Sequence, residues 1–202
     1  EWAMPSDADI IAGQIAPYRE QLADADAIVF VGGTDHNLDC EGRDRTSMQF
    51  PQGQTELIRQ VSAINGKTIV VLMHGAPIDL PWIDRVPAVL DMFFPGMEGG
   101  TAMADILFGD ADPSGRLTFS WPERLEDSPV YKLATQDVDN VNYEDSLMVG
   151  YRYFDTKRVT PRYEFGYGLS YTTFDYSKMK VKKDGDNCIV TLNVKNTGSR
   201  DG

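Results

Sequence analysis

The chain has 202 residues, 42% of them hydrophobic, and a formal net charge of -12 at pH 7. That length is enough for one hydrophobic core and the beginning of a second domain. The excess of acidic residues argues against nucleic acid and anionic membranes as partners, because both are bound through clusters of Lys and Arg. We attribute the acidity to solubility rather than to steering of a substrate.

The chain has only two cysteines and two histidines as potential ligands for a metal such as zinc, and they are scattered. Cys40 and Cys188 are far apart, and His36 and His74 do not form a cluster with them. Because zinc sites need clustered ligands such as a CxxC pair, no metal site and no cofactor is expected. A disulfide between the two cysteines is compatible with the sequence, but nothing requires it. No stretch is long and apolar enough to span a bilayer.

The first quarter of the chain contains one helical pattern and one strand pattern. Apolar residues recur with helical spacing over residues 10–22, and Asp7 or Asp9 is the expected cap. A short apolar run at 27–32 indicates a buried strand. The polar loop that follows, over 33–50, is longer than most strand-to-helix connections, and long loops in compact domains tend to be functional.

The next segment repeats this alternation. A helix is expected over residues 54–61, with Pro51 in its first turn and the Asn-Gly pair at 65–66 at its end, in the left-handed conformation. The β-branched, apolar run at 68–73 is typical of a strand buried on both faces. A single helical turn is expected at 81–85.

A third strand is expected at 88–93, before a glycine-rich loop at 95–100. These glycines are read as tight turns and close packing, because no Lys-Ser/Thr pair follows as in a phosphate-binding loop. The helix after them, over 101–108, should end at Gly109.

The last third of the chain changes character. A short strand is expected at 117–121 and an irregular surface strap at 122–142, followed by two alternating runs at 174–183 and 188–194 that predict a hairpin. The change from helix–strand alternation to a hairpin marks a boundary near Tyr171. The predicted fold class is therefore α/β, a three-layer α/β/α sandwich with a mostly parallel sheet, followed by a short antiparallel β-hairpin.

The loop at 33–50 holds the candidate for chemistry. Ligands of open parallel sheets are met at the carboxyl ends of the strands, and Glu41 stands there among glycines and arginines. Asp39 is a rival acid, and His36 is a possible sugar contact. Taken alone, a glutamate in a polar loop is more often simply solvated.

Glycines, charges and aromatic residues recur in four separated motifs: EGRDRTS at 41–47 with FPQGQ at 50–54; FPGMEGG at 94–100 with ADILFG at 104–109; DPSGRL at 112–117; and YE at 143–144 with VGYRYFD at 149–155 and FGYGLSYT at 165–172. In order and spacing they resemble the second domain of glycoside hydrolase family 3, the β-glucosidases, β-xylosidases and related exo-acting enzymes.

The resemblance implies a division of the chain into two parts. Residues 1–172 would be the family's C-terminal α/β domain, including the strap, and residues 173–202 the truncated beginning of a fibronectin type III-like domain. The family's N-terminal barrel, which carries the aspartate nucleophile, is not in this chain. Since Glu1 is not preceded by a leader or an initiator methionine, the chain is expected to be a fragment.

The resemblance also implies the chemistry. The chain would be a fragment of a retaining exo-acting β-glycosidase that supplies the general acid/base, and Glu41 matches the family's acid/base position. Retaining enzymes hold two carboxyl groups about 5–5.5 Å apart, one as nucleophile and one as acid/base. The expected partners are β-linked glucosides or related oligosaccharides and the barrel. Asp44 and Arg45 are expected to hold the loop as a pair.

Two other functions stay open. The same fold could serve as a non-catalytic carbohydrate-binding or scaffold module, in which Glu41 would be dispensable. A flavodoxin-like ligand domain is the third interpretation, which the missing phosphate loop disfavours. The compartment is not specified by the sequence, although a periplasmic or secreted location is favoured for substrates of this class.

Overall fold

The computed structural model describes residues 6–42, 45–131, 143 and 145–202. Its centre is a parallel sheet of β1 (Ile28–Gly33), β2 (Thr68–Met73) and β3 (Ala88–Asp91), in the order β1-β2-β3. All three strands end at the same edge of the sheet. That edge is where the loops of interest begin.

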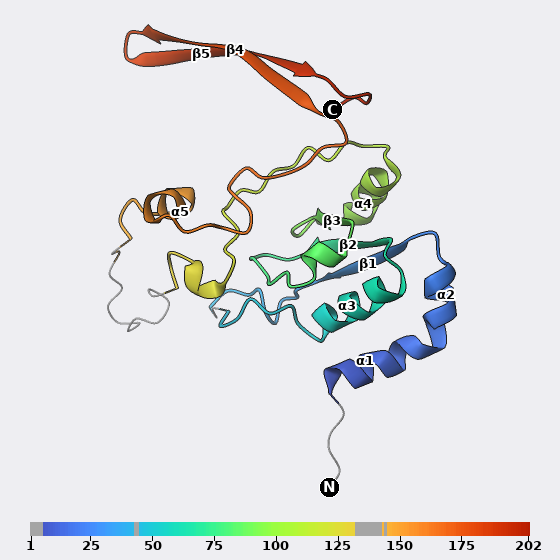
Figure 1. The fold of residues 1–202 in the computed structure, drawn as a ribbon. Helices are drawn as coiled ribbons and strands as arrows, with labels where there is room; N and C mark the ends of the chain where they lie inside the picture. Colours follow the sequence, from blue (N-terminus) through green and yellow to red (C-terminus); the bar gives the residue numbers. More distant parts are fainter. Residues whose placement is uncertain (1–5, 43–44, 132–142, 144) are drawn as a thin grey trace.

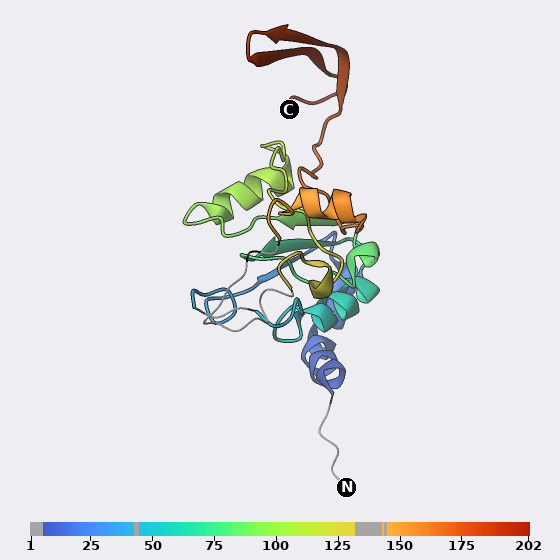
Figure 2. The same cartoon turned by 90° about the vertical axis from the view of Figure 1, so that its left-hand side faces the viewer.

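Helices cover both sides of this sheet (Figures 1 and 2). On one side lie α1 (Asp7–Ile15), the 3-10 turn η1 (Ala16–Tyr18), α2 (Arg19–Asp24) and α3 (Gln54–Ile64). On the other side, next to β3, lies α4 (Gly99–Phe108). The predicted α/β/α class is therefore confirmed.

The first helical segment differs from the prediction. The expected single helix over 10–22 is interrupted by the 3-10 turn at Pro17, because proline has no N–H to donate to the preceding turn. The cap is Ser6 rather than an aspartate. The Ser6 hydroxyl accepts from the Asp9 N–H, and the Asp9 carboxylate accepts from the Ser6 N–H in return, which is a capping box.

Helix α3 begins and ends differently from the sequence expectation. It starts after Gly53, at φ 70°, so that Pro51 lies before the first turn. It stops at Asn65, which is extended rather than left-handed. The Asn65 amide donates to the carbonyl oxygens of Leu22 (3.0 Å) and Ala25 (2.9 Å), and these bonds tie the helix end to α2.

The core lies between the sheet and α3. Val70 and Leu72 of β2 are fully buried, as is Ile58 of α3, and the rings of Trp82 and Trp121 close the same cluster. A continuous apolar strand buried on both faces is what the sequence predicts for β2, and this is confirmed. Burying side chains of this size contributes about 1.5–3 kcal/mol each, before entropy is counted.

Two smaller elements follow the prediction closely. The short turn η2 (Ile83–Arg85) is present, and Gly109 ends α4 in the left-handed conformation at φ 82°. Strand β3 is shorter than expected, because the chain turns at Phe93, which has φ 50°.

The strand expected at 117–121 is not formed. The segment instead meets a later part of the chain at its two ends. The Leu117 N–H donates to the Tyr167 carbonyl (2.9 Å), and the Trp121 N–H donates to the Tyr163 carbonyl (2.8 Å). A single bridge at Trp121 is too little for a ladder, so the prediction of a strand here is wrong.

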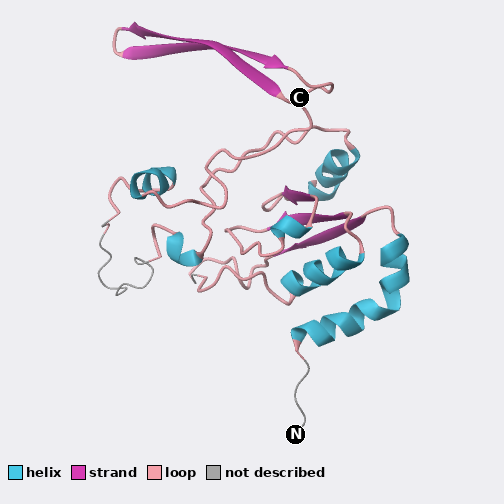
Figure 3. Cartoon of the chain, viewed as in Figure 1, coloured by secondary structure: helices cyan, strands magenta, loops and turns pink. Residues whose placement is uncertain are grey.

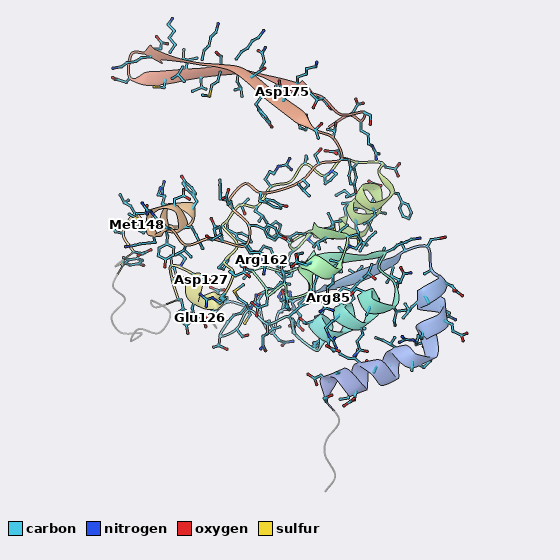
Figure 4. All side chains as sticks on the ribbon, viewed as in Figure 1. Arg85, Glu126, Asp127, Met148, Arg162 and Asp175 are labelled. Carbon is cyan, nitrogen blue, oxygen red and sulfur yellow. The ribbon has the colours of Figure 1, made fainter. Side chains whose placement is uncertain are left out.

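Loops make up most of the chain between α4 and the hairpin (Figure 3). They are interrupted by η3 (Leu125–Asp127) and by α5 (Tyr151–Lys157), of which Phe154 alone is buried. Asp127, on η3 (Figure 4), pairs with Arg124, and the distance from its Oδ1 to Arg124 Nη2 is 3.0 Å. Most of the predicted strap, at 132–142, lies outside the described residues.

The predicted hairpin is confirmed as β4 (Phe174–Asp184) and β5 (Asn187–Asn196), paired antiparallel. It extends away from the α/β body (Figure 1), and its side chains point outward on both faces (Figure 4). One face is apolar, with Tyr176 opposite Val194 and Val181 opposite Val190. All four of these side chains are exposed.

The junction between body and hairpin is held by polar contacts. The Asp112 carboxylate accepts from the Ser170 hydroxyl (2.8 Å) and from the Tyr171 N–H (2.7 Å). The Tyr171 hydroxyl donates to the Ile106 carbonyl of α4 (2.8 Å), and the Arg200 guanidinium lies over the Tyr171 ring. None of the helices in the described part of the chain is both long and apolar enough to cross a membrane.

Candidate active site

Three loops leave the carboxyl edge of the sheet, after Gly33 of β1, Met73 of β2 and Asp91 of β3 (Figure 1). The first is the polar loop singled out by the sequence. Its base is closed by Gln54, whose side-chain amide accepts from the Gly33 N–H (3.0 Å) and donates to the Gly33 carbonyl (2.9 Å). The loop is therefore tied to the sheet where it leaves β1.

Asp39 anchors the middle of this loop to the loop after β2. Its Oδ2 accepts from the Gly75 N–H at 2.9 Å and also from the Thr34 hydroxyl, while its Oδ1 lies 3.6 Å from Nη1 of Arg45. The Asp39 side chain is only 9% exposed. The carboxylate that sequence reasoning weighs as a rival acid thus has its oxygens committed to neighbouring donors.

Arg45 provides the second anchor. Its Nη1 donates to the Ala76 carbonyl at 3.2 Å, and its side chain is 14% exposed. The expected partner, Asp44, lies outside the described residues. In the described part of the chain, Arg45 instead contacts both Asp39 and the turn after β2. Because Ala76 is 31 residues further along the chain, no local sequence pattern indicates the second contact.

The turn after β2, which contacts both Asp39 and Arg45, is itself held by His74. Nδ1 of this buried ring lies 2.9 Å from the Ala76 carbonyl, which can only accept, so Nδ1 carries the proton. Nε2 lies 3.1 Å from Oδ1 of Asp91, an ion-pair distance without the geometry of a hydrogen bond. The rings of Phe93 and Trp121 pack around it. His74 therefore makes the local contacts expected from sequence.

Glu41 lies on an exposed turn between the two anchors, two residues after Asp39 and four before Arg45. The structure therefore brings the candidate acid to the carboxyl edge of the sheet and leaves its side chain accessible. His36 is exposed on the same loop.

An aromatic ring from the third loop completes this edge. Phe94, which is 54% exposed, packs on Gly75, where an added Cβ would lie 2.8 Å from its Cε2 and 3.3 Å from Oδ2 of Asp39. A side chain at Gly75 would therefore displace the Phe94 ring and crowd the Asp39 carboxylate. Sequence reasoning did not find Phe94 or Gly75 as parts of this site, because neither is in the polar loop.

A hollow of about 250 Å³ lies behind the anchors, lined largely by apolar side chains, including Met48, Phe119 and Phe154, with Arg45 as its charged group. Glu41 does not line it. The hollow therefore belongs to the back of the loop and not to the exposed turn that carries the candidate acid.

Asp79 adds a second carboxyl group close to Arg45. Partial burial raises the pKa of Asp79 above its usual range, and the charge of Arg45 opposes this shift without cancelling it. The Asp79 N–H donates to the Met48 carbonyl at 2.7 Å, which fixes the distal arm of the loop. Among the residues that the structure describes, no three His, Cys, Asp or Glu side chains are grouped so that they could hold a metal ion.

Comparison with known proteins defines the class. Residues 11–171 match the model of the glycosyl hydrolase family 3 C-terminal domain, and the chain belongs to this family. It is 42% identical over 179 residues to thermostable beta-glucosidase B of Acetivibrio thermocellus, which covers 88% of the chain. It is 40% identical over 189 residues to beta-glucosidase BoGH3A of Bacteroides ovatus, which covers 89%.

Solved structures agree with this assignment. The crystal structure of beta-glucosidase from Kluyveromyces marxianus in complex with glucose superposes with a TM-score of 0.87 at 34% identity, covering 98% of this chain and 23% of that one. The Bifidobacterium adolescentis GH3 beta-glucosidase also gives a TM-score of 0.87, covering 98% of this chain and 29% of its own. The chain spans 24% and 25% of the two curated relatives above, about a quarter of their length.

Proposed function

We propose that this chain is the part of a retaining exo-acting β-glycosidase, of β-glucosidase type, that supplies the general acid/base, and that Glu41 is this residue. The observation that carries the proposal is the placement of Glu41 on an exposed turn at the carboxyl edge of the sheet, with an anchor on either side. Membership of a family whose similar members are beta-glucosidases supplies the substrate class.

The reaction needs a second carboxylate, which an N-terminal barrel of the full-length protein would supply. In the first step that carboxylate forms a bond to the anomeric carbon, and the glycosidic C–O electron pair leaves with the oxygen. Glu41 transfers its proton to that oxygen. In the second step Glu41, now ionised, takes a proton from water as the water displaces the nucleophile. The two carboxyl groups of retaining enzymes lie about 5–5.5 Å apart, so the barrel carboxylate would lie at about this distance from Glu41.

We also propose a division into two domains, which rests on the hairpin. Residues 173–202 would begin a fibronectin type III-like domain, after an α/β domain over residues 1–172. Its support is the exposed apolar row that includes Val181 and Val190, because a two-stranded ribbon is marginal alone and further strands would cover this row.

The test compares the full-length protein with its Glu41→Gln variant on two aryl β-glucosides. Because general acid catalysis contributes about 10²–10⁴-fold, kcat/KM for the poorly activated phenyl glucoside should fall by at least about 100-fold. The 2,4-dinitrophenyl glucoside, whose leaving group needs little protonation, should lose far less in kcat/KM. Azide should restore turnover of the activated substrate by Glu41→Ala.

Glu20→Gln is the matched control, because Glu20 is an exposed glutamate on α2, before the amino end of β1. It should be as active as the parent protein on both substrates. Unchanged turnover of the phenyl glucoside by Glu41→Gln would contradict the assignment, and would leave this fold as a binding or scaffold module.

A further inference from the structure

We propose that Asp39 is the positioning residue for Glu41, acting as a carboxylate clamp that closes the first half of the loop onto the turn after β2. This inference rests on the proposed acid/base role of Glu41 and adds to it a residue whose task is to hold that turn in place. Asp39 itself does not take part in the proton transfer.

The clamp is built from contacts across three separate segments. Asp39 accepts hydrogen bonds from the Thr34 hydroxyl, at the start of the loop, and from the Gly75 N–H, 36 residues further along the chain than Asp39. Its Oδ1 faces the Arg45 guanidinium at 3.6 Å. The Asp39 carboxylate thus contacts the loop on both sides of Glu41, at Thr34 and at Arg45, and it also contacts the loop after β2 at Gly75.

Charge and burial both strengthen the contacts of Asp39. A hydrogen bond to an ionised acceptor is roughly twice as strong as a neutral one, and Asp39 is 9% exposed, so water competes little for its oxygens. Arg45 is also attracted to Asp79, but it faces Asp39 directly and bonds the Ala76 carbonyl at 3.2 Å. Removing Asp39 would therefore free the turn, while Arg45 would keep its bond to the Ala76 carbonyl and its attraction to Asp79.

The turn after β2, which contacts Asp39, is held by contacts of its own. Gly75 and Ala76 follow the fully buried His74, whose Nδ1–H is bonded to the Ala76 carbonyl. Phe94 presses on Gly75 from the third loop. A loop clamped to such a turn is held with the precision that proton transfer requires, since a misplacement of about 1 Å can cost about 100-fold in rate.

The experiment measures kcat/KM of Asp39→Ala, Glu41→Gln and the double variant in the full-length protein, on phenyl and 2,4-dinitrophenyl β-glucosides. We expect Asp39→Ala to lose about 10–100-fold on the phenyl glucoside and less than about threefold on the dinitrophenyl glucoside. Because Asp39 acts through Glu41, the double variant should lose no more than Glu41→Gln alone.

Thr34→Val is the milder variant, for use if Asp39→Ala does not fold. It removes one hydroxyl from the clamp, and it should show the same selective loss at about 3–10-fold. Asp26→Asn, an exposed aspartate before β1, is the control and should change neither substrate.

The outcomes separate the two proposals. Equal losses on both substrates, or losses that multiply in full with that of Glu41→Gln, would show that Asp39 has a merely structural role and overturn the inference alone. An Asp39→Ala protein as active as the parent would do the same. If Glu41→Gln itself leaves the phenyl glucoside unaffected, the acid/base role falls and the positioning role falls with it.

Discussion

Asp79, close to Arg45 in the site, has a carboxyl group whose burial makes the stability of the protein depend on pH. Its carboxyl group is partly buried, and burial raises its pKa despite the attraction of Arg45. An acid whose pKa is higher in the folded state stabilises the fold below its unfolded pKa, and this stabilisation is lost as the pH rises through the folded pKa. At neutral pH the ionised Asp79 therefore costs stability.

The Asp79→Asn variant should have a higher unfolding temperature than the parent protein at pH 7, because the amide carries no charge to desolvate. The difference should shrink as the pH is lowered through the raised pKa of Asp79, because the carboxyl group then takes up its proton and loses the charge that burial penalises. Thermal unfolding followed by circular dichroism at several pH values measures this. A difference that is the same at every pH would contradict the assigned cause, and Asp26→Asn should give no difference.

The sequence predicts the residues of the site better than their contacts. The polar loop and Glu41 are evident because charges and glycines gather after an apolar run. The contact between Asp39 and Gly75 joins two loops 36 residues apart, and no local pattern shows which of several acidic side chains turns inward. Asp39 was therefore a rival acid on sequence grounds, and its buried, bonded carboxylate is visible only in three dimensions.

At the scale of elements, patterns of burial decided what could be predicted. Strand β2 is buried on both faces, and its continuous apolar run indicates it clearly. Helix α5 has one buried residue, Phe154, so it has no apolar stripe for periodicity to detect. The segment at 117–121 has the composition of a strand, but its neighbour meets it only at the ends, and composition cannot show that a partner strand is missing.

Two glycines, one in a helix and one at the end of a strand, differ sharply in the space around them. In α1, a Cβ added to Gly13 meets no atom within 4 Å. At the end of β1, a Cβ added to Gly33 would overlap the Met73 carbonyl oxygen.

Gly13→Ala should therefore stabilise the protein by about 0.5–1 kcal/mol, because alanine loses less backbone entropy in a helix. Gly33→Ala should destabilise it by about 1–3 kcal/mol, because backbone must move to relieve the overlap. Chemical denaturation of both variants beside the parent protein measures the change in the free energy of unfolding. Equal effects of the same sign at the two sites would refute the packing argument.

At the scale of the whole molecule, the hairpin is joined to the body by a few polar contacts rather than by a core. Asp112 carries two of them, to Ser170 and to the Tyr171 N–H, and Tyr171 adds a third to α4. Both Asp112 contacts stand where the body ends and the hairpin begins, so this carboxylate holds the connection between them.

Asp112→Ala should loosen the junction more than Tyr171→Phe does. It removes two hydrogen bonds to a charged acceptor, worth about 1.5–3 kcal/mol each, whereas Tyr171→Phe removes one neutral bond worth about 0.5–1.5 kcal/mol. Limited proteolysis should then cut faster near residues 171–173, and hydrogen exchange of the Tyr171 amide should accelerate. Asp110→Ala, at an exposed neighbour in the same region, is the control. Unchanged cleavage in Asp112→Ala would show that the hairpin is held by other contacts.

The hydrogen bonds from Leu117 and Trp121 to Tyr167 and Tyr163 have a consequence for how such chains can diverge. The polypeptide between residues 121 and 163 departs from and returns to one point, so insertions or deletions there need not disturb the sheet. Doubling the length of such an excursion adds only about 0.6 kcal/mol of closure entropy. Changes of length within this excursion that leave the buried Phe154 in place can therefore be absorbed while the carboxyl edge of the sheet keeps its geometry.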